Sequence, residues 1–128
     1  MSDYSKVNLL KIESSSQTEG LEARFARKYL DSRDLGVSLF RYAPNYQSKN
    51  AHSHKIQEEA YVVVEGSGHI LLNNKTEELR LWDVIRVSPE VTRAFEAGPD
   101  GLTLLAVGGP KPEGGDGVKQ TPEWPTKQ

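Results

Sequence analysis

The order of apolar and polar positions along the chain predicts a protein built from short β-strands. Apolar residues alternate with polar ones or form short β-branched runs, and turn-forming residues follow each run. The clearest segments are residues 37–42, 60–64, 69–72, 83–87, 92–96 and 102–107. Their spacing of about ten residues is typical of an all-β sandwich or barrel. No long helical pattern separates them, so a parallel α/β sheet is not expected.

Two groups of turn-forming residues are expected to end strands inside this region. Residues 66–68 are Gly-Ser-Gly and are expected to stop the strand over 60–64. Residues 98–101 are Gly-Pro-Asp-Gly and are expected to separate the last two strands.

The regions that flank these strands suggest three parts of the chain. Residues 1–20 are mostly polar and are expected to form a short N-terminal arm, and residues 21–107 form the barrel. Residues 108–128 are rich in Gly and Pro and are expected to form a flexible tail, on which Trp124 either docks against the barrel or lies loose. Arms of this kind are often ordered by pairing with another chain, so a homodimer is expected.

Residues 21–30 allow two interpretations. Leu21, Phe25 and Tyr29 recur at four-residue spacing, which favours a helix. The same stretch also suits a strand around residues 23–26.

Length, charge and composition narrow the function classes. The chain has 128 residues, which fits one domain, and a formal net charge of −2. No stretch clusters basic residues strongly, so nucleic-acid binding is not expected. The absence of cysteine excludes a thiolate nucleophile and any sulfur-ligated zinc site.

Localisation and cofactor class follow from further sequence features. No apolar run approaches the ~20 residues that span a bilayer, and the N-terminus lacks the apolar stretch of a signal peptide. A cytoplasmic protein without membrane attachment is therefore expected. No glycine-rich loop leads into a helix, so no nucleotide cofactor is expected.

Two histidines and a glutamate form the most informative cluster. His52 and His54 are two residues apart, so on a strand their side chains share a face. Glu59 begins the next strand, and an antiparallel neighbour can bring its carboxylate beside both imidazoles. Such a set suits Fe(II), Mn(II), Ni(II), Cu(II) or Zn(II). Glu58 is the alternative carboxylate, because only strand register separates the two.

These residues also carry a family resemblance. The spacing of His52, His54, Glu59 and Gly66 resembles the first motif of the cupins. That motif has two histidines separated by one residue, then a glutamate after four more residues and a glycine after a further six. The family's motif opens with a glycine where this chain has Tyr46. The preceding Asn45 can serve the turn, because asparagine tolerates positive φ.

The second cupin motif is not retained. That motif consists of a glycine, a proline, a second glycine, a histidine and an asparagine at fixed spacing. This chain has other residues at all five positions, in order Trp82, Ser88, Glu90, Arg93 and Ala97. In cupins the fourth of these positions supplies a third histidine ligand, which a protonated guanidinium cannot replace. Two alternatives stay open for Arg93. It grips a carboxylate or phosphate of the ligand beside a metal, or it pairs with Glu59 or Glu58 in the metal's place.

The resemblance implies a cupin-like double-stranded β-helix, a jelly-roll barrel with a short arm and a flexible tail. It implies a small-molecule pocket with His52, His54 and Glu59 as metal ligands. Arg93, Tyr61 and Phe95 are the candidate ligand-binding residues. The expected function is that of a small-molecule-binding protein, as a metal-dependent oxygenase, isomerase or lyase acting on a small anionic compound. The alternative is a metal-free ligand-binding or sensor module in which Arg93 holds the anionic group, so whether the protein is an enzyme stays open.

Overall fold

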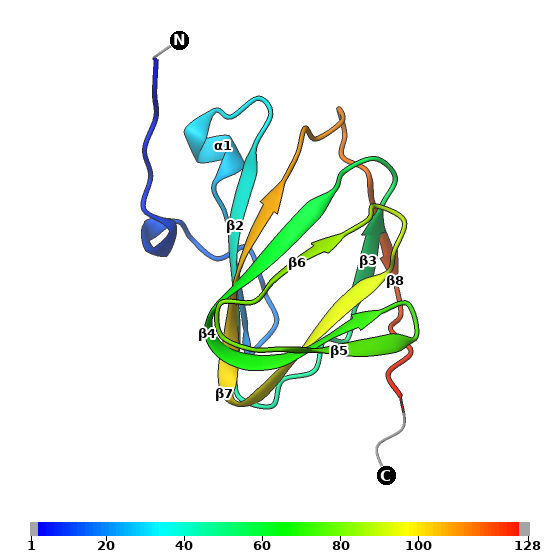
Figure 1. The fold of residues 1–128 in the computed structure, drawn as a ribbon. Helices are drawn as coiled ribbons and strands as arrows, with labels where there is room; N and C mark the ends of the chain where they lie inside the picture. Colours follow the sequence, from blue (N-terminus) through cyan, green and yellow to red (C-terminus); the bar gives the residue numbers. More distant parts are fainter. Residues whose placement is uncertain (1–2, 126–128) are drawn as a thin grey trace.

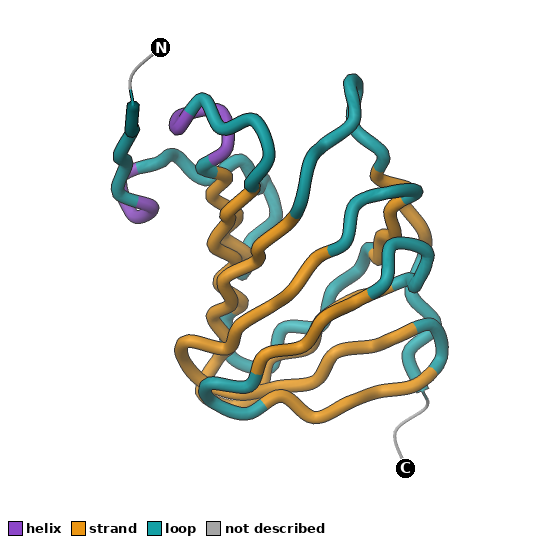
Figure 2. Tube along the Cα trace, turned by 45° about the horizontal axis from the view of Figure 1, so that its top comes forward, coloured by secondary structure: helices purple, strands orange, loops and turns teal. Residues whose placement is uncertain are grey.

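The structure is a computed structural model that describes residues 3–125, and its strands curl into a barrel (Figure 1). The strands are β1 (Leu21–Phe25), β2 (Gly36–Tyr42), β3 (Ala51–His54), β4 (Glu59–Leu72), β5 (Lys75–Leu79), β6 (Val84–Val87), β7 (Arg93–Gly108) and β8 (Gly117–Gln120). The two short helices are η1 (Leu9–Lys11) and α1 (Arg27–Leu30). Figure 2 shows both short helices on the outside of the barrel, at the side of β1 and β2. In the described part of the chain, no helix has the length and apolar character that a membrane span needs. The predicted all-β barrel is confirmed.

Two long strands, β4 and β7, form the centre of the barrel and pair antiparallel along most of their length. The first half of β4 pairs with the second half of β7, and β6 and β2 extend this layer on either side. The second half of β4 pairs with the first half of β7, and β5 and β3 extend that layer. The two layers of the jelly roll are therefore the two halves of the same pair of strands.

The expected strand breaks at residues 66–68 and 98–101 are wrong, because β4 and β7 continue through them. The register between the two strands shifts near Gly66 and Gly68, which marks β-bulges at the bend. A Cβ on Gly66, whose φ is +72°, would lie 2.0 Å from the Gly101 carbonyl oxygen. A Cβ on Gly68 would lie 2.1 Å from the Glu96 carbonyl oxygen. These glycines allow two strands to bend together in close contact, rather than ending them.

The core lies between the two layers, on the faces that point into the barrel. Alternate residues of β4 and β7 supply most of it, as the period of a strand requires. The buried side chains are those of Tyr42, Tyr61, Val63, Ile70, Leu79, Val87, Phe95, Ala97, Leu102, Leu104 and Ala106. β5, which the sequence analysis did not assign, contributes one buried side chain and four exposed ones.

The stretch over residues 21–30 contains both elements that its sequence allowed. β1 pairs with β2 along its whole length, and α1 follows directly. The four-residue spacing of apolar side chains does not mark a buried helix face: Ala23 and Ala26 are buried, whereas Phe25 and Tyr29 are exposed.

The segment assigned to the C-terminal tail contains β8, which pairs antiparallel with β3. Trp124 lies against the barrel: its indole N–H donates to the Ser48 carbonyl oxygen at 3.1 Å, and its ring packs on the cluster formed by Ala51, Leu71 and Ala94. The glycines of this segment gave no apolar pattern from which a strand could be predicted. Its pairing with β3 is made by the backbone.

Two turns have a left-handed backbone at or next to a position where the cupin motifs have glycine. Asn45, beside the position of the first motif's opening glycine, has a φ of 63°, as its tolerance of positive φ suggested. Trp82, at the opening glycine of the second motif, has a φ of 70° and is 67% exposed. Its backbone N–H donates to the Val63 carbonyl oxygen at 2.8 Å, which fixes the turn. The turn is therefore kept although a tryptophan is unfavourable in a left-handed backbone conformation.

We expect Trp82→Gly to be more stable than Trp82→Ala by about 1 kcal/mol, because both lose the exposed indole and only glycine relieves the left-handed strain. Chemical denaturation of the two variants measures the difference in the free energy of unfolding. An alanine variant as stable as the glycine variant would contradict this account of the turn.

Candidate functional site

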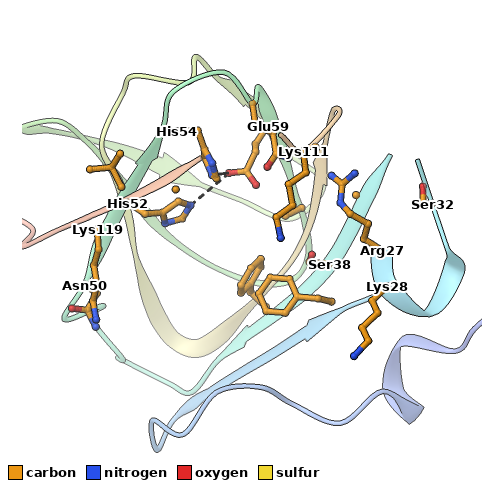
Figure 3. A pocket seen from close by; sticks show the side chains of 18 of the residues that line it. Arg27, Lys28, Ser32, Ser38, Asn50, His52, His54, Glu59, Lys111 and Lys119 are labelled. Atoms are coloured by element: carbon orange, nitrogen blue, oxygen red, sulfur yellow. Dashed lines mark ion pairs between the residues drawn. The ribbon is translucent and has the colours of Figure 1, made fainter. Parts of the chain in front are cut away.

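A pocket of about 860 Å³ opens at one end of the barrel (Figure 3). Its wall combines β3 and β8 with the first residue of β4, parts of β1 and β2, the end of β7, and α1. The segment after β7 contributes Lys111. Its volume falls within the range of small-molecule sites in proteins, about 300–1,000 Å³.

β3 presents both histidines to this pocket. Ala51 and Ser53 are buried, whereas His52 and His54 are partly exposed and both line the pocket. The two imidazole rings meet edge to face, with centroids 5.2 Å apart. The predicted common face of the two histidines is therefore present.

Glu59 reaches the histidines from the start of β4, across the barrel. β3 pairs with β7 and β8, whereas β4 pairs with β5, β6 and β7, so the expected direct pairing of the two strands is wrong. The carboxylate of Glu59 lies near both imidazoles because the barrel closes on itself. Glu58 points away: its side chain is 60% exposed and pairs with Arg86 at 2.9 Å.

One carboxylate oxygen, Glu59 Oε1, is the meeting point of the site. His54 Nε2 lies 3.2 Å from it and His52 Nε2 lies 3.6 Å from it. The Tyr61 hydroxyl donates to the same oxygen at 2.6 Å, and Arg93 Nη1 donates to it at 3.0 Å. Four side chains from three strands therefore face a single oxygen.

Arg93 lies beneath the pocket and is completely buried. It is the cross-strand partner of His52, which explains why its side chain enters the barrel beside the histidines. Its Nη2 donates to the Ser88 carbonyl oxygen at 2.7 Å, so the guanidinium is held from two sides. Arg93 therefore neutralises Glu59 from the interior of the barrel.

Asp116 holds His54 from the opposite side of the imidazole ring. Its Oδ1 lies 2.9 Å from His54 Nδ1, and its Oδ2 accepts the backbone N–H groups of Ile56 and Gln57 at 2.8 and 2.7 Å. Burial opposes ionisation of Asp116, but these donors outweigh it and lower its pKa to about 2. An ionised carboxylate only accepts hydrogen bonds, so the proton of His54 lies on Nδ1.

The charges around Glu59 favour its ionised form. Burial alone would raise its pKa, but the two imidazoles and the Tyr61 hydroxyl lower it well below its usual value. The Glu59 carboxylate raises the pKa of His54; partial burial opposes this effect and Asp116 reinforces it. Burial raises the pKa of Tyr61 well above its usual value, so the phenol stays a hydrogen-bond donor.

The orientation of His54 tests whether these residues fit a metal ion. Its Nε2 is buried and, among residues 3–125, has no hydrogen-bond partner. In a neutral imidazole with its proton on Nδ1, Nε2 presents a lone pair to the carboxylate oxygen 3.2 Å away. A metal ion or a proton is needed between these two acceptors. The ligand atoms of His52, His54 and Glu59 lie within 4.8 Å of one another, so the donor set fits a divalent transition metal.

The remaining candidate residues lie behind this set. Arg93, Tyr61 and Phe95 are each at most 3% exposed, and none of the three is in the pocket wall. A role for them in direct ligand binding stays a prediction. The contacts that the structure shows support the Glu59 carboxylate or the core: Arg93 and Tyr61 donate to it, and Phe95 packs edge to face on Tyr61.

Sequence reasoning did not identify Asp116 as part of the site. It lies 62 residues from His54 in a glycine-rich segment, with no spacing that relates it to the histidines. The only signal was a single acidic residue between glycines.

We expect Arg93→Met to destabilise the protein by about 3–5 kcal/mol, because it leaves Glu59 buried without its cation. The double variant Arg93→Met/Glu59→Gln is expected to lose less than the sum of the two single variants, by at least about 1 kcal/mol. Denaturant unfolding of the four proteins measures this coupling. Additive effects would show that the buried pair is not an energetic unit.

We expect Asp116→Ala to destabilise the protein by about 1–3 kcal/mol, since two backbone N–H groups and one imidazole lose their acceptor. Thermal unfolding measures the loss, with Asp100→Ala as the control at an exposed aspartate. An Asp116→Ala protein as stable as the control would contradict the orienting role of this carboxylate.

The comparisons with known proteins agree with this architecture. No family model matches the sequence, and no curated protein matches it. Solved structures do match. A cupin protein from Bacteroides fragilis superposes with a TM-score of 0.72 at 22% identity, over 86% of each chain. The polyketide cyclase RemF from Streptomyces resistomycificus has a TM-score of 0.69 at 20% identity, over 81% of this chain and 78% of that one.

A longer enzyme contains a similar domain. A variant of oxalate decarboxylase from Bacillus subtilis has a TM-score of 0.72 at 17% identity; the match covers 81% of this chain and 29% of that one. At these identities the likeness concerns the fold and not the chemistry. The strand order, the bent central pair of strands and these structural neighbours agree, and the chain has the cupin fold in a single domain.

Proposed function

We propose that this protein binds a small molecule in the barrel pocket, beside a divalent metal ion held by His52, His54 and Glu59. The proposed activity is that of a metal-dependent oxygenase, isomerase or lyase acting on a small anionic compound. The observation that carries this proposal is the orphaned His54 Nε2, which faces Glu59 Oε1 at 3.2 Å inside the pocket.

The residues around the three proposed metal ligands support a metal-binding site that is open to a substrate. Asp116 fixes the ring of His54, and such carboxylate–histidine pairs orient metal ligands and raise their basicity. His52 is more open, with 41% of its side chain exposed, and borders the space that a substrate would enter. A bound metal ion supplies Lewis acidity or, for a redox-active metal, electron transfer.

The other side chains have roles that follow from their contacts. Tyr61 and Arg93 donate to Glu59 and restrict its carboxylate to one orientation. Because these donors come from the interior, the side of the site that faces the pocket is left to the imidazoles and the substrate.

A metal-free binding module is the second candidate, and Arg93 favours it. Its guanidinium occupies the position at which cupins have a third histidine, and it already neutralises Glu59 at 3.0 Å. In this case His54 is protonated, and the two imidazoles with Glu59 form a polar wall that recognises the ligand without a metal.

Elemental analysis of tag-free protein purified without chelator distinguishes the two candidates. We expect about one transition-metal ion per chain, because two imidazoles and an ionised carboxylate converge. His52→Ala/His54→Ala should lose this metal, whereas His69→Ala should keep it, since His69 is exposed on β4 outside the site. No metal in the wild-type protein, even after incubation with Fe(II), Mn(II), Ni(II), Cu(II) or Zn(II), would favour the metal-free module.

A cytoplasmic location and a homodimer also remain predictions. Light scattering coupled to size-exclusion chromatography tests the oligomeric state at several protein concentrations. A mass of about 28 kDa, twice that of the 14.2 kDa chain, is expected for the dimer.

A further inference from the structure

A second polar group in the pocket lies away from the histidines, on the side formed by α1. Arg27 begins this helix and points its guanidinium into the pocket (Figure 3). It takes no part in the metal-ligand cluster, which contains His52, His54 and Glu59. The role of this arginine is therefore separate from the chemistry described above.

The guanidinium of Arg27 is positioned by the backbone and retains unused donors. Its Nη2 donates to the Gly109 carbonyl oxygen at 2.7 Å. Its Nη1 is buried and has no hydrogen-bond partner in the described part of the chain. No carboxylate within residues 3–125 forms an ion pair with it. A buried cationic donor without a partner is costly unless a ligand supplies the acceptor.

Gly36 makes room for this arginine. A Cβ at Gly36 would lie 2.4 Å from Arg27 Nη2 and 3.0 Å from its Cζ. The glycine, at the start of β2, has no positive φ that would require it. Close approach of the guanidinium is therefore what the missing side chain permits.

Other charges of the pocket add to the positive field. Lys28, Lys111 and Lys119 line it together with Arg27, against two carboxylates, those of Asp31 and Glu59. Glu59 is already neutralised by Arg93 at 3.0 Å. Figure 3 shows Lys111 reaching into the pocket from the segment after β7, from a different part of the chain than Arg27. The field favours an anion.

The pocket also offers an apolar surface. Phe25 and Phe40 line it, and their rings pack edge to face with centroids 5.5 Å apart. Phe25 is 46% exposed, which is a large exposure for an aromatic side chain on a strand. Ala106 and Val118 continue this surface.

We propose that Arg27, assisted by Lys111, is an anion subsite that holds the carboxylate or phosphate head group of a ligand whose apolar body lies on Phe25 and Phe40. This inference deepens the proposed function and rests on it for the reaction, but not for the binding. The anion-binding role then belongs to Arg27, which lines the pocket and keeps a donor without a partner at Nη1, and not to the fully buried Arg93. The reactive part of the ligand then faces His52 and His54.

Titration of ¹⁵N-labelled protein with small probes tests this subsite. The probes are phenylacetate and phenyl phosphate, with neutral phenylacetamide as the uncharged analogue. We expect at least one of the two anions to shift the amide resonances of α1, β2 and residues 108–111, and to bind about tenfold or more tightly than the amide. The stronger of the two anions identifies the head group.

Two variants and one control assign the binding to Arg27. Arg27→Gln removes the charge, and Gly36→Ala displaces the guanidinium while the charge remains. Both variants are expected to bind the anion about tenfold or more weakly than the wild-type protein does. Arg33→Gln removes an exposed cation that pairs with Asp34 outside the pocket, and it should bind as the wild-type protein does. Thermal unfolding of each variant confirms that it is folded.

The outcomes separate this inference from the metal proposal. Anion binding that persists with chelator and in His52→Ala/His54→Ala supports the subsite even if no metal is found. Equal binding of phenylacetamide, unchanged binding in folded Arg27→Gln, or binding of no probe overturns it. Metal binding that persists in Arg27→Gln, together with loss of the anion, supports two independent parts of one pocket.

Discussion

The structure of the site depends on a carboxylate that is largely removed from water. Glu59 has only 15% of its side chain exposed and stays ionised. A buried charge is stable only where opposite charges and hydrogen bonds replace its hydration. Arg93 and Tyr61 donate to it from the interior, and the two imidazoles face it from the pocket. The barrel must place β3, β4 and β7 so that all of these groups meet.

This constraint explains why one site allows two chemical states. The space between His54 Nε2 and Glu59 Oε1 requires a positive charge, and either a proton or a metal ion supplies it. The positive charge of Arg93 offsets the negative charge of the Glu59 carboxylate and so weakens the attraction of this site for a metal ion. Asp116 acts in the opposite direction, because it orients the imidazole and increases its basicity. Arg93 and Asp116 therefore act in opposite directions on the affinity of this site for a metal ion.

Much of the fold was predictable from local patterns. Alternation and turn residues identified most strands, and the spacing of His52, His54 and Glu59 identified the central cluster. The prediction that strands end at residues 66–68 and 98–101 is wrong. A glycine that ends a strand and a glycine that permits close packing look the same in sequence. Only the long-range pairing of β4 with β7 distinguishes them.

The rest of the site depends on contacts between distant parts of the chain. Asp116 contacts His54, and Arg27 lines the pocket, from segments with no recognisable motif. The burial of Arg93 follows from its register opposite His52, which spacing alone does not give. A residue at a familiar motif position can therefore act on its neighbouring carboxylate rather than on a ligand. The pocket residues away from the histidines include Arg27 on α1, Lys119 on β8 and Lys111 after β7.

The most direct test of the central claim is anomalous diffraction from crystals of tag-free protein grown with Mn(II), Zn(II) or Ni(II). We expect an anomalous peak at the absorption edge of the metal, in contact with His52 Nε2, His54 Nε2 and the Glu59 carboxylate. A map without a peak, in which His54 Nε2 donates directly to Glu59, would contradict the metal centre. It would leave a proton as the charge that the site requires.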